Sequence, residues 1–263
     1  MERAFDLGKG EFGSEALKAV ARYAAPLFWI SAAGSGERKV NNGTMFIIDV
    51  PEGLFAMTAN HVFEKYLQAK ESSASIACRI GCKGFDGPRG TLPFEPESRL
   101  IDRDPEADIA TFRLSRSQVA LIGSTPLTAW PPVVPRAGSG VAFAGFPGHE
   151  RKFAGSLAPS FAVLPVMTVA TSVSHRLISC QLERGVHGPG FPAAPANYDT
   201  GGLSGGPLLV DDGENGCWRL GGVITQGNAE LDIVRASRVD RLRPDGTFER
   251  RAFTLQGRNA PPS

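Results

Sequence analysis

Residues 199–210 read DTGGLSGGPLLV, with Ser204 held between two pairs of glycine residues and Pro207 opening an apolar run. The segment GLSGG fits the G-x-S-x-G pattern of a nucleophile elbow, which requires a helix directly after the serine. Pro207 and the run PLLV instead predict a strand, because proline lacks an amide donor and is tolerated at the first residue of a strand. The stretch therefore favours an all-β fold over an α/β fold.

Short apolar or alternating runs, separated by Gly, Pro, Asn and Asp, continue through most of the chain. They include LFWISAA, TMFIIDV, LFAMTA, DIATFRL, VAFAGF, HRLISCQL and WRLGGVIT. About ten to twelve short strands without long helices between them predict an all-β protein. Because these strands are too many for one small barrel, we expect two packed barrels, joined by a Pro-rich link.

The expected organisation has five parts. Residues 1–25 form an extension with a short helix, in which Ser14 is the cap and Leu17 and Val20 recur at helical spacing. The first barrel covers 26–118, the link 119–136, the second barrel 137–252 and the tail 253–263.

Composition and charge exclude several classes of function. A formal net charge of +1 over 263 residues argues against nucleic acid or an anionic membrane as partner, since both favour a basic surplus. The sequence shows neither a membrane-spanning segment nor the pattern of a signal peptide. Four cysteines are too few for a disulfide framework, so we expect reduced thiols and a cytoplasmic location. Their spacing predicts no metal site, and no cofactor is expected; the four are Cys78, Cys82, Cys180 and Cys217.

A serine becomes a nucleophile when a base removes its proton and a third group orients that base. His61 is the preferred base, because it follows the strand-like run LFAMTA and precedes residues that can form a helical turn. Asp108 is the preferred acid, since it stands where the alternating strand DIATFRL begins. The remaining histidines and two nearby acids are expected to face solvent: His149, His175, His187, Asp102 and Asp104.

The segments TANHV, ADIATFRL and GGLSGGP occur in that order, with NNGTMFII before the first and GGVITQG after the last. In these segments the chain resembles the trypsin- and chymotrypsin-like serine endopeptidases, in particular their disulfide-free bacterial members. The resemblance spans roughly residues 26–243 and implies two six-stranded antiparallel β-barrels with the active site between them. It implies that His61 is the general base, Asp108 its orienting acid and Ser204 the nucleophile. The amides of Gly202 and Ser204 then form the oxyanion hole, which binds the negatively charged oxygen of the intermediate.

The same resemblance implies where a protein or peptide substrate binds. Thr225, Gln226 and Gly227 form an edge along which the substrate pairs as an added strand. The floor of the primary pocket falls at Tyr198 and Asp199. A tyrosine there favours small or apolar side chains, whereas an inward aspartate favours Lys or Arg, and the sequence leaves both open.

The chain departs from the secreted members at Leu203, where they carry an aspartate that pairs with the newly cut N-terminus. Activation by such a cut is therefore not expected, and any regulatory partner protein is unidentified. Two alternatives to a protease stay open at this stage. One is a catalytically inactive binding module on the same fold, and the other is an esterase of the α/β-hydrolase type.

Overall fold

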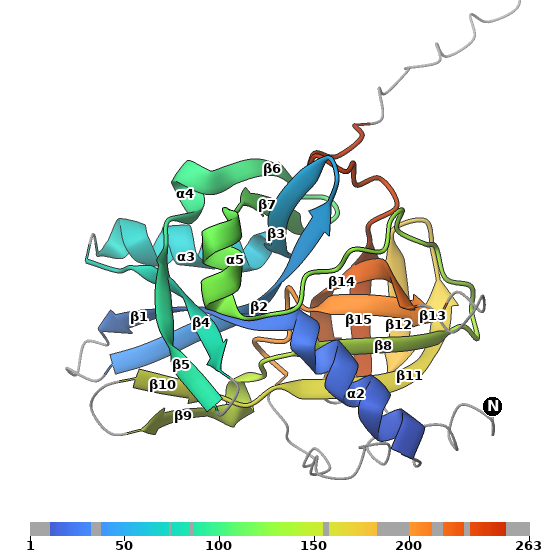
Figure 1. The fold of residues 1–263 in the computed structure, drawn as a ribbon, viewed down its shortest axis with the longest axis horizontal. Helices are drawn as coiled ribbons and strands as arrows, with labels where there is room; N and C mark the ends of the chain where they lie inside the picture. Colours follow the sequence, from blue (N-terminus) through green and yellow to red (C-terminus); the bar gives the residue numbers. More distant parts are fainter. Residues whose placement is uncertain are drawn as a thin grey trace, which may run out of the picture.

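The computed structural model describes residues 11–32, 38–73, 75–84, 87–154, 158–182, 200–211, 218–228 and 232–250. Figure 1 shows two β-rich halves side by side, with few helices. The helices are α2 (Glu11–Tyr23), α3 (Asn60–Ser72), α4 (Pro96–Arg99) and α5 (Arg116–Ile122), and a 3₁₀ turn η1 covers Gly148–Glu150. The mostly-β class predicted from the sequence is confirmed.

The first half is a seven-stranded antiparallel sheet in the order β5-β4-β1-β2-β3-β7-β6. Its strands are β1 (Ala24–Ala32), β2 (Arg38–Val50), β3 (Gly53–Ala59), β4 (Cys78–Gly84), β5 (Gly87–Phe94), β6 (Leu100–Asp104) and β7 (Ile109–Arg113).

The second half is a closed barrel in the order β11-β12-β15-β14-β13-β8. Its strands are β8 (Gly140–Gly145), β11 (Leu164–Val173), β12 (Leu177–Gln181), β13 (Pro207–Asp211), β14 (Trp218–Asn228) and β15 (Ile233–Arg238). A separate hairpin joins β9 (Arg151–Ala154) to β10 (Ala158–Phe161).

The expectation of two closed six-stranded barrels is therefore right for the second half and wrong for the first. In the described residues, the edge strands β5 and β6 do not pair with each other. Pro93 in β5 has no amide to donate, which suits an edge position. The edge at β6 is covered instead by the C-terminal segment, where the Phe248 amide donates to Asp102 Oδ2 at 3.0 Å.

One apolar core runs through both halves. Phe46 and Met57 of the sheet belong to the same buried cluster as Ala144, Leu209 and Val223 of the barrel. A second buried cluster lies between the first sheet and helices α3 and α5, and a third fills the inside of the barrel. Because the shared cluster is continuous, the two halves are held in a fixed relation and the segments between them are positioned by packing.

Helix α2 packs against β8 and β11 of the barrel, although it precedes the first strand of the sheet (Figure 1). Leu17 and Val20 are fully buried in this contact. The N-terminal helix predicted from the sequence is thus present, but Ser14 lies inside it and is not its cap. No helix in the described ranges is long and apolar enough to cross a membrane.

Candidate active site

His61 and Asp108 are in direct contact at the N-terminus of α3. Asp108 Oδ2 lies 2.7 Å from His61 Nδ1, and Asp108 Oδ1 accepts a hydrogen bond from the His61 amide, also at 2.7 Å. The Asp108 carbonyl oxygen accepts from the Asn60 amide at 3.0 Å. Ala59, the residue before the helix, offers no side-chain cap, and Asp108 instead satisfies two of the free amides of the first turn, those of Asn60 and His61. With Nδ1 donating to the carboxylate, Nε2 is the ring nitrogen able to accept a proton.

The turn between β6 and β7 sets the position of Asp108. Asp104 Oδ1 accepts from the amides of Glu106 and Ala107, both at 3.0 Å, which fixes the shape of this turn. Asp108 then adopts φ 56°, a left-handed conformation that aspartate tolerates better than most residues. One carboxylate therefore shapes the turn that presents the other to His61.

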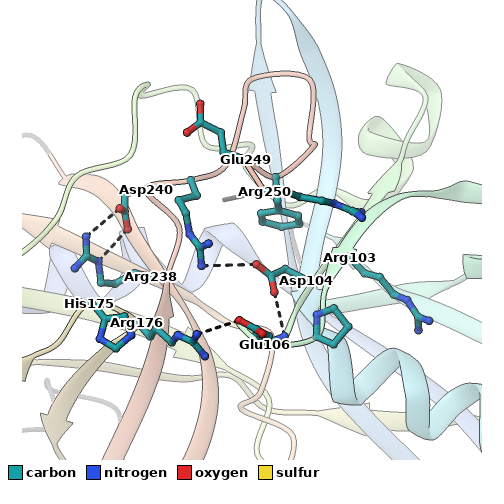
Figure 2. A pocket seen from close by; sticks show the side chains of 12 residues that line it. Arg103, Asp104, Glu106, His175, Arg176, Arg238, Asp240, Glu249 and Arg250 are labelled. Atoms are coloured by element: carbon teal, nitrogen blue, oxygen red, sulfur yellow. Dashed lines mark hydrogen bonds and ion pairs between the residues drawn. The ribbon is translucent and has the colours of Figure 1, made fainter. Parts of the chain in front are cut away.

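Ion pairs from the barrel hold the same turn (Figure 2). Arg176 pairs with Glu106 at 3.0 Å, and Arg241 approaches Asp104 at 3.8 Å. These side chains line a cavity of about 560 Å³. Exposed pairs of this kind contribute at most about 1 kcal/mol each, so their main effect is to hold the turn in register with the barrel. The position of Asp108 thus depends on residues from both halves.

Asp102 and Asp104 are not the solvated loop residues that the sequence predicts. Both lie in β6, and their side chains are 15% and 19% exposed. Asp102 accepts from the amides of Arg103 and Phe248 and pairs with Arg250 at 2.9 Å. The expectation failed because β6, with the sequence LIDRD, lacks the apolar pattern of a strand.

Ser204 lies in the turn that precedes β13, and the backbone of this turn is attached to the first sheet. The Thr44 amide of β2 donates to the Ser204 carbonyl oxygen at 2.8 Å, and Thr44 Oγ1 donates to the Gly202 carbonyl oxygen at 2.7 Å. A Cβ atom on Gly205, at φ +92°, would overlap Thr44 O and Thr58 Oγ1. Only glycine allows this approach, which brings the serine turn against the sheet.

The same part of β2 contacts the helix that carries His61. A Cβ atom on Gly43 would overlap the side chain of Val62, the residue after His61. Thr58, three residues before His61, donates through Oγ1 to Thr44 O at 2.6 Å. The turn of Ser204 and the N-terminal end of α3 therefore both contact β2 at Gly43 and Thr44.

The Ser204 hydroxyl itself donates to the Thr225 carbonyl oxygen, with a long oxygen–oxygen distance of 3.4 Å. The hydrogen bonds of the described residues include none between Ser204 and His61. The structure thus joins His61 to Asp108 and brings the turn of Ser204 beside them, but it does not direct the hydroxyl onto the imidazole.

Two amides of the serine turn have no acceptor among the described residues. Leu203 donates to Thr200 O, Gly205 to Ile224 O and Gly206 to Leu203 O, whereas no such bond uses the amides of Gly202 and Ser204. Gly202 has φ +102°, which other residues resist. Two unused amides spaced one residue apart can converge on a single oxygen atom, as an oxyanion hole requires.

Leu203, between these two amides, is 2% exposed and packs in the core of the barrel. A Cβ atom on Gly145 would lie 3.0 Å from Leu203 Cδ2. The turn is therefore anchored by apolar packing.

Replacing Leu203 by aspartate should lower the free energy of unfolding by about 3–5 kcal/mol, because a carboxylate without a partner is buried and an apolar contact is lost. Urea unfolding followed by fluorescence measures this loss. Leu203→Met, which conserves volume, is the control and should cost less than about 1.5 kcal/mol. An aspartate variant as stable as the native protein would show that the turn does not depend on this packing.

The predicted substrate-binding residues fall into two groups. Thr225, Gln226 and Gly227 lie in β14, where Gln226 and Gly227 pair with β15 on one side. On the other side the described residues supply no backbone partner beyond Ile224, which bonds to Gly205 and Gly206. The described residues therefore leave this edge of β14 unpaired at Gln226 and Gly227. Tyr198 and Asp199 lie outside the described residues.

Neither of the other two histidines that the structure describes contacts His61 or Asp108. His149 lies in η1 and His175 lines the cavity of Figure 2, and both are exposed, as predicted. His187 lies outside the described residues. Among the residues that the structure describes, no three His, Cys, Asp or Glu side chains cluster as a metal ion would need.

Three supporting residues were missed from the sequence. Thr44 and Thr58 link the serine turn to the sheet, and Asn42 Nδ2 donates to Phe146 O at 2.7 Å beside Gly202. The available signal was the polar character of NNGT and of Thr58 within otherwise apolar strands.

No protein-family model matches the sequence, and no curated protein matches it. Among solved structures, the chain is similar to a thermostable serine protease, AL20, from an extremophilic microorganism. The two share 15% sequence identity over 84% of this chain and 92% of that chain, with a TM-score of 0.48. At this level, the similarity carries no conclusion about the activity of the chain.

Proposed function

We propose that the protein is a serine endopeptidase that hydrolyses peptide bonds with His61, Asp108 and Ser204. The observation that carries the proposal is the double contact of Asp108 with His61, made beside the strand residues to which the turn of Ser204 is bonded. The unused amides of Gly202 and Ser204 provide the further donors that acyl transfer requires.

In the first half of the reaction, Ser204 Oγ attacks the carbonyl carbon of the substrate and its proton passes to His61 Nε2. Asp108 stabilises the resulting imidazolium, and the amides of Gly202 and Ser204 donate to the negatively charged oxygen. The C–N bond then breaks, the leaving nitrogen takes the proton from Nε2, and an acyl-Ser204 ester remains.

In the second half, water replaces the released amine. His61 Nε2 removes a proton from the water as its oxygen attacks the acyl carbon. The bond to Ser204 Oγ breaks, the proton returns to Ser204, and the free acid departs. The cycle requires the Ser204 hydroxyl to turn from Thr225 O to Nε2, which is a change of side-chain rotamer.

A second candidate function is a binding module without catalysis, and the bond from Ser204 Oγ to Thr225 O favours it. The α/β-hydrolase alternative is wrong, because strand β13 follows Ser204 where that fold requires a helix.

Incubation with a peptide library, followed by mass spectrometry of the products, tests the proposal. The native protein should cut internal peptide bonds with a defined preference, and Ser204→Ala should leave the library intact. Equal cutting by both proteins would assign the activity elsewhere, and no cutting by the native protein would favour the binding module.

We also propose a reducing, cytoplasmic location, supported by the free thiols of Cys78, Cys82 and Cys180. Cys217 lies outside the described residues. Burial raises the pKa of Cys180 to about 12 and also raises the pKa of Cys78 and Cys82. A raised pKa reduces the thiolate fraction at a given pH, and the thiolate is the reactive form.

Alkylation by iodoacetamide at pH 8 should therefore modify half-buried Cys82 before buried Cys78 and Cys180, and each rate should rise with pH. Peptide mapping by mass spectrometry measures the order, with the protein unfolded in urea as the control. Modification of Cys180 in the folded protein as fast as in urea would contradict its burial.

A further inference from the structure

A second cavity, of about 490 Å³, borders the turn of Ser204. Its lining brings together β1, β2, α3 and the turn residues Gly201 and Gly202. We call this cavity the basic groove and define it by Trp29, Lys39, Asn42, Lys65, Arg151 and Gly202. It shares Gly202 with the proposed oxyanion hole, so it lies directly beside the site of the reaction.

The charged side chains that line the basic groove are all positive. Its lining includes Lys39, Lys65 and Arg151 and contains no acidic residue. In the part of the chain that the structure describes, none of these three cations pairs with a carboxylate; Arg151 donates to the carbonyl oxygens of Gly148 and Val40. The cavity of Figure 2 is different, because its arginines pair with acids. The basic groove therefore has positive charge that no carboxylate of the described residues neutralises.

The groove also contains unused polar atoms. Trp29 Nε1 and Asn42 Oδ1 are buried without a hydrogen-bond partner among the described residues. Buried polar atoms are almost always paired, directly or through water. Both residues line the groove, which therefore contains polar groups that the described residues leave unsatisfied.

Helix α3 places the groove on the side of the leaving group. His61, Lys65, Gln68 and Ser72 are spaced by four, three and four residues, so they share one face of the helix. The last three line the groove. Because His61 must deliver its proton to the leaving nitrogen, the face that carries it is the side on which the leaving segment lies.

If a substrate pairs along β14, its acyl segment lies on the β14 side of Ser204. The edge of β14 that the described residues leave unpaired begins at Thr225, whose carbonyl oxygen receives the Ser204 hydroxyl. Thr44 of β2, two residues after Asn42 of the groove, donates its amide to the Ser204 carbonyl oxygen. A peptide paired along β14 and cut at Ser204 therefore continues towards the basic groove.

We propose that the basic groove binds carboxylate groups of the segment that leaves first, so that the enzyme prefers acidic residues directly after the cut bond. This inference rests on the proposed function. The carboxylates come from Asp or Glu side chains or from the C-terminus of the substrate. Both are negatively charged and can pair with the three cations of the groove.

Cleavage of a proteome-derived peptide library at low salt tests the preference. We expect Asp and Glu to be enriched over Lys and Arg by about tenfold at the first three positions after the cut. Because Lys39 and Lys65 are exposed, 0.5 M NaCl should reduce the enrichment. A second library with amidated C-termini separates the two sources: loss of cleavage after amidation assigns the C-terminal carboxylate, and unchanged enrichment assigns the side chains.

The double variant Lys39→Glu/Lys65→Glu should remove or reverse the enrichment. Arg113→Glu and Lys18→Glu, combined, form the matched control, since they change the net charge equally. Arg113 is exposed at the opposite end of β7 from Asp108, and Lys18 lies on α2. The control should keep the native preference.

The proposal is overturned if the native protein cuts the library with neither acidic enrichment nor a loss of cleavage after amidation. It is also overturned if the control abolishes the preference as fully as the groove variant does. If the native protein cuts nothing, the proposed protease function is wrong, but the groove can still be tested as a carboxylate site by measuring binding. Rhodamine-labelled hexaglutamate should then bind the native protein at least about fivefold more tightly than the groove variant. Equal affinity of the two proteins would refute the basic groove as a carboxylate site.

Discussion

Replacing Ser204 by alanine is expected to lower kcat for peptide hydrolysis by about 10⁶-fold, since no other group in the site forms the acyl intermediate. Ser204 is part of a turn positioned by backbone bonds, and its hydroxyl makes one long hydrogen bond. The variant should therefore fold normally. Steady-state cleavage of a peptide found in the library measures the loss, and thermal unfolding checks the fold.

His61→Ala should cause a loss of similar size, and the double variant should cost little more than either change alone. Residues that act as a unit give such non-additive effects. If the two losses instead multiplied, His61 and Ser204 would be acting independently, and the shared mechanism would be wrong.

Asp108→Asn is expected to keep the fold and reduce kcat by about 10⁴-fold. The amide oxygen of asparagine can still accept from the His61 amide and cap α3, so the helix is retained. The amide NH₂ group, however, then faces His61 Nδ1 and favours the tautomer in which Nε2 carries the proton. Nε2 can no longer remove the proton of Ser204.

Asp102→Asn is the matched control for this change. Asp102 lies in the neighbouring strand β6 and bonds to Phe248 and Arg250, away from His61. Its variant should keep kcat within about threefold while losing some stability. Equal loss of activity in both variants would show that Asp108 only caps helix α3 and does not orient His61 for catalysis.

The strands with clear two-residue alternation could be predicted from the sequence, and so could the pairing of His61 with Asp108. The roles given to the other candidate site residues stay predictions. His61 and Asp108 were identified because each stands at the end of a predictable strand, and the structure places them in contact. The glycines around Ser204 could be interpreted from the sequence, because they indicate tight turns with backbone conformations that other residues resist.

What could not be predicted depends on contacts between distant residues. Strands β6 and β15 were missed, since LIDRD and IVRASR carry charged residues whose partners lie elsewhere in the chain. Helix α3 is longer than the predicted turn because Val62, Phe63 and Tyr66 pack on the sheet. Closure of the first barrel was expected wrongly, because nothing local to β6 shows that the C-terminal segment covers its edge.

The bonds from Thr44 to the serine turn join residues more than one hundred positions apart, and only the folded chain reveals them. They tie the turn of Ser204 to the sheet from which helix α3, with His61, extends. The site therefore depends on the packing of the two halves as much as on its own residues.

The most direct test of the central claim is covalent labelling with a fluorophosphonate, read by intact mass and by peptide mapping. This reagent reports a serine whose hydroxyl is activated by a base. We predict one adduct per chain, located on Ser204, formed by the full-length protein without proteolytic trimming and lost in His61→Ala. A folded native protein that forms no adduct, or an adduct on Ser204 that forms equally fast in His61→Ala, would contradict it.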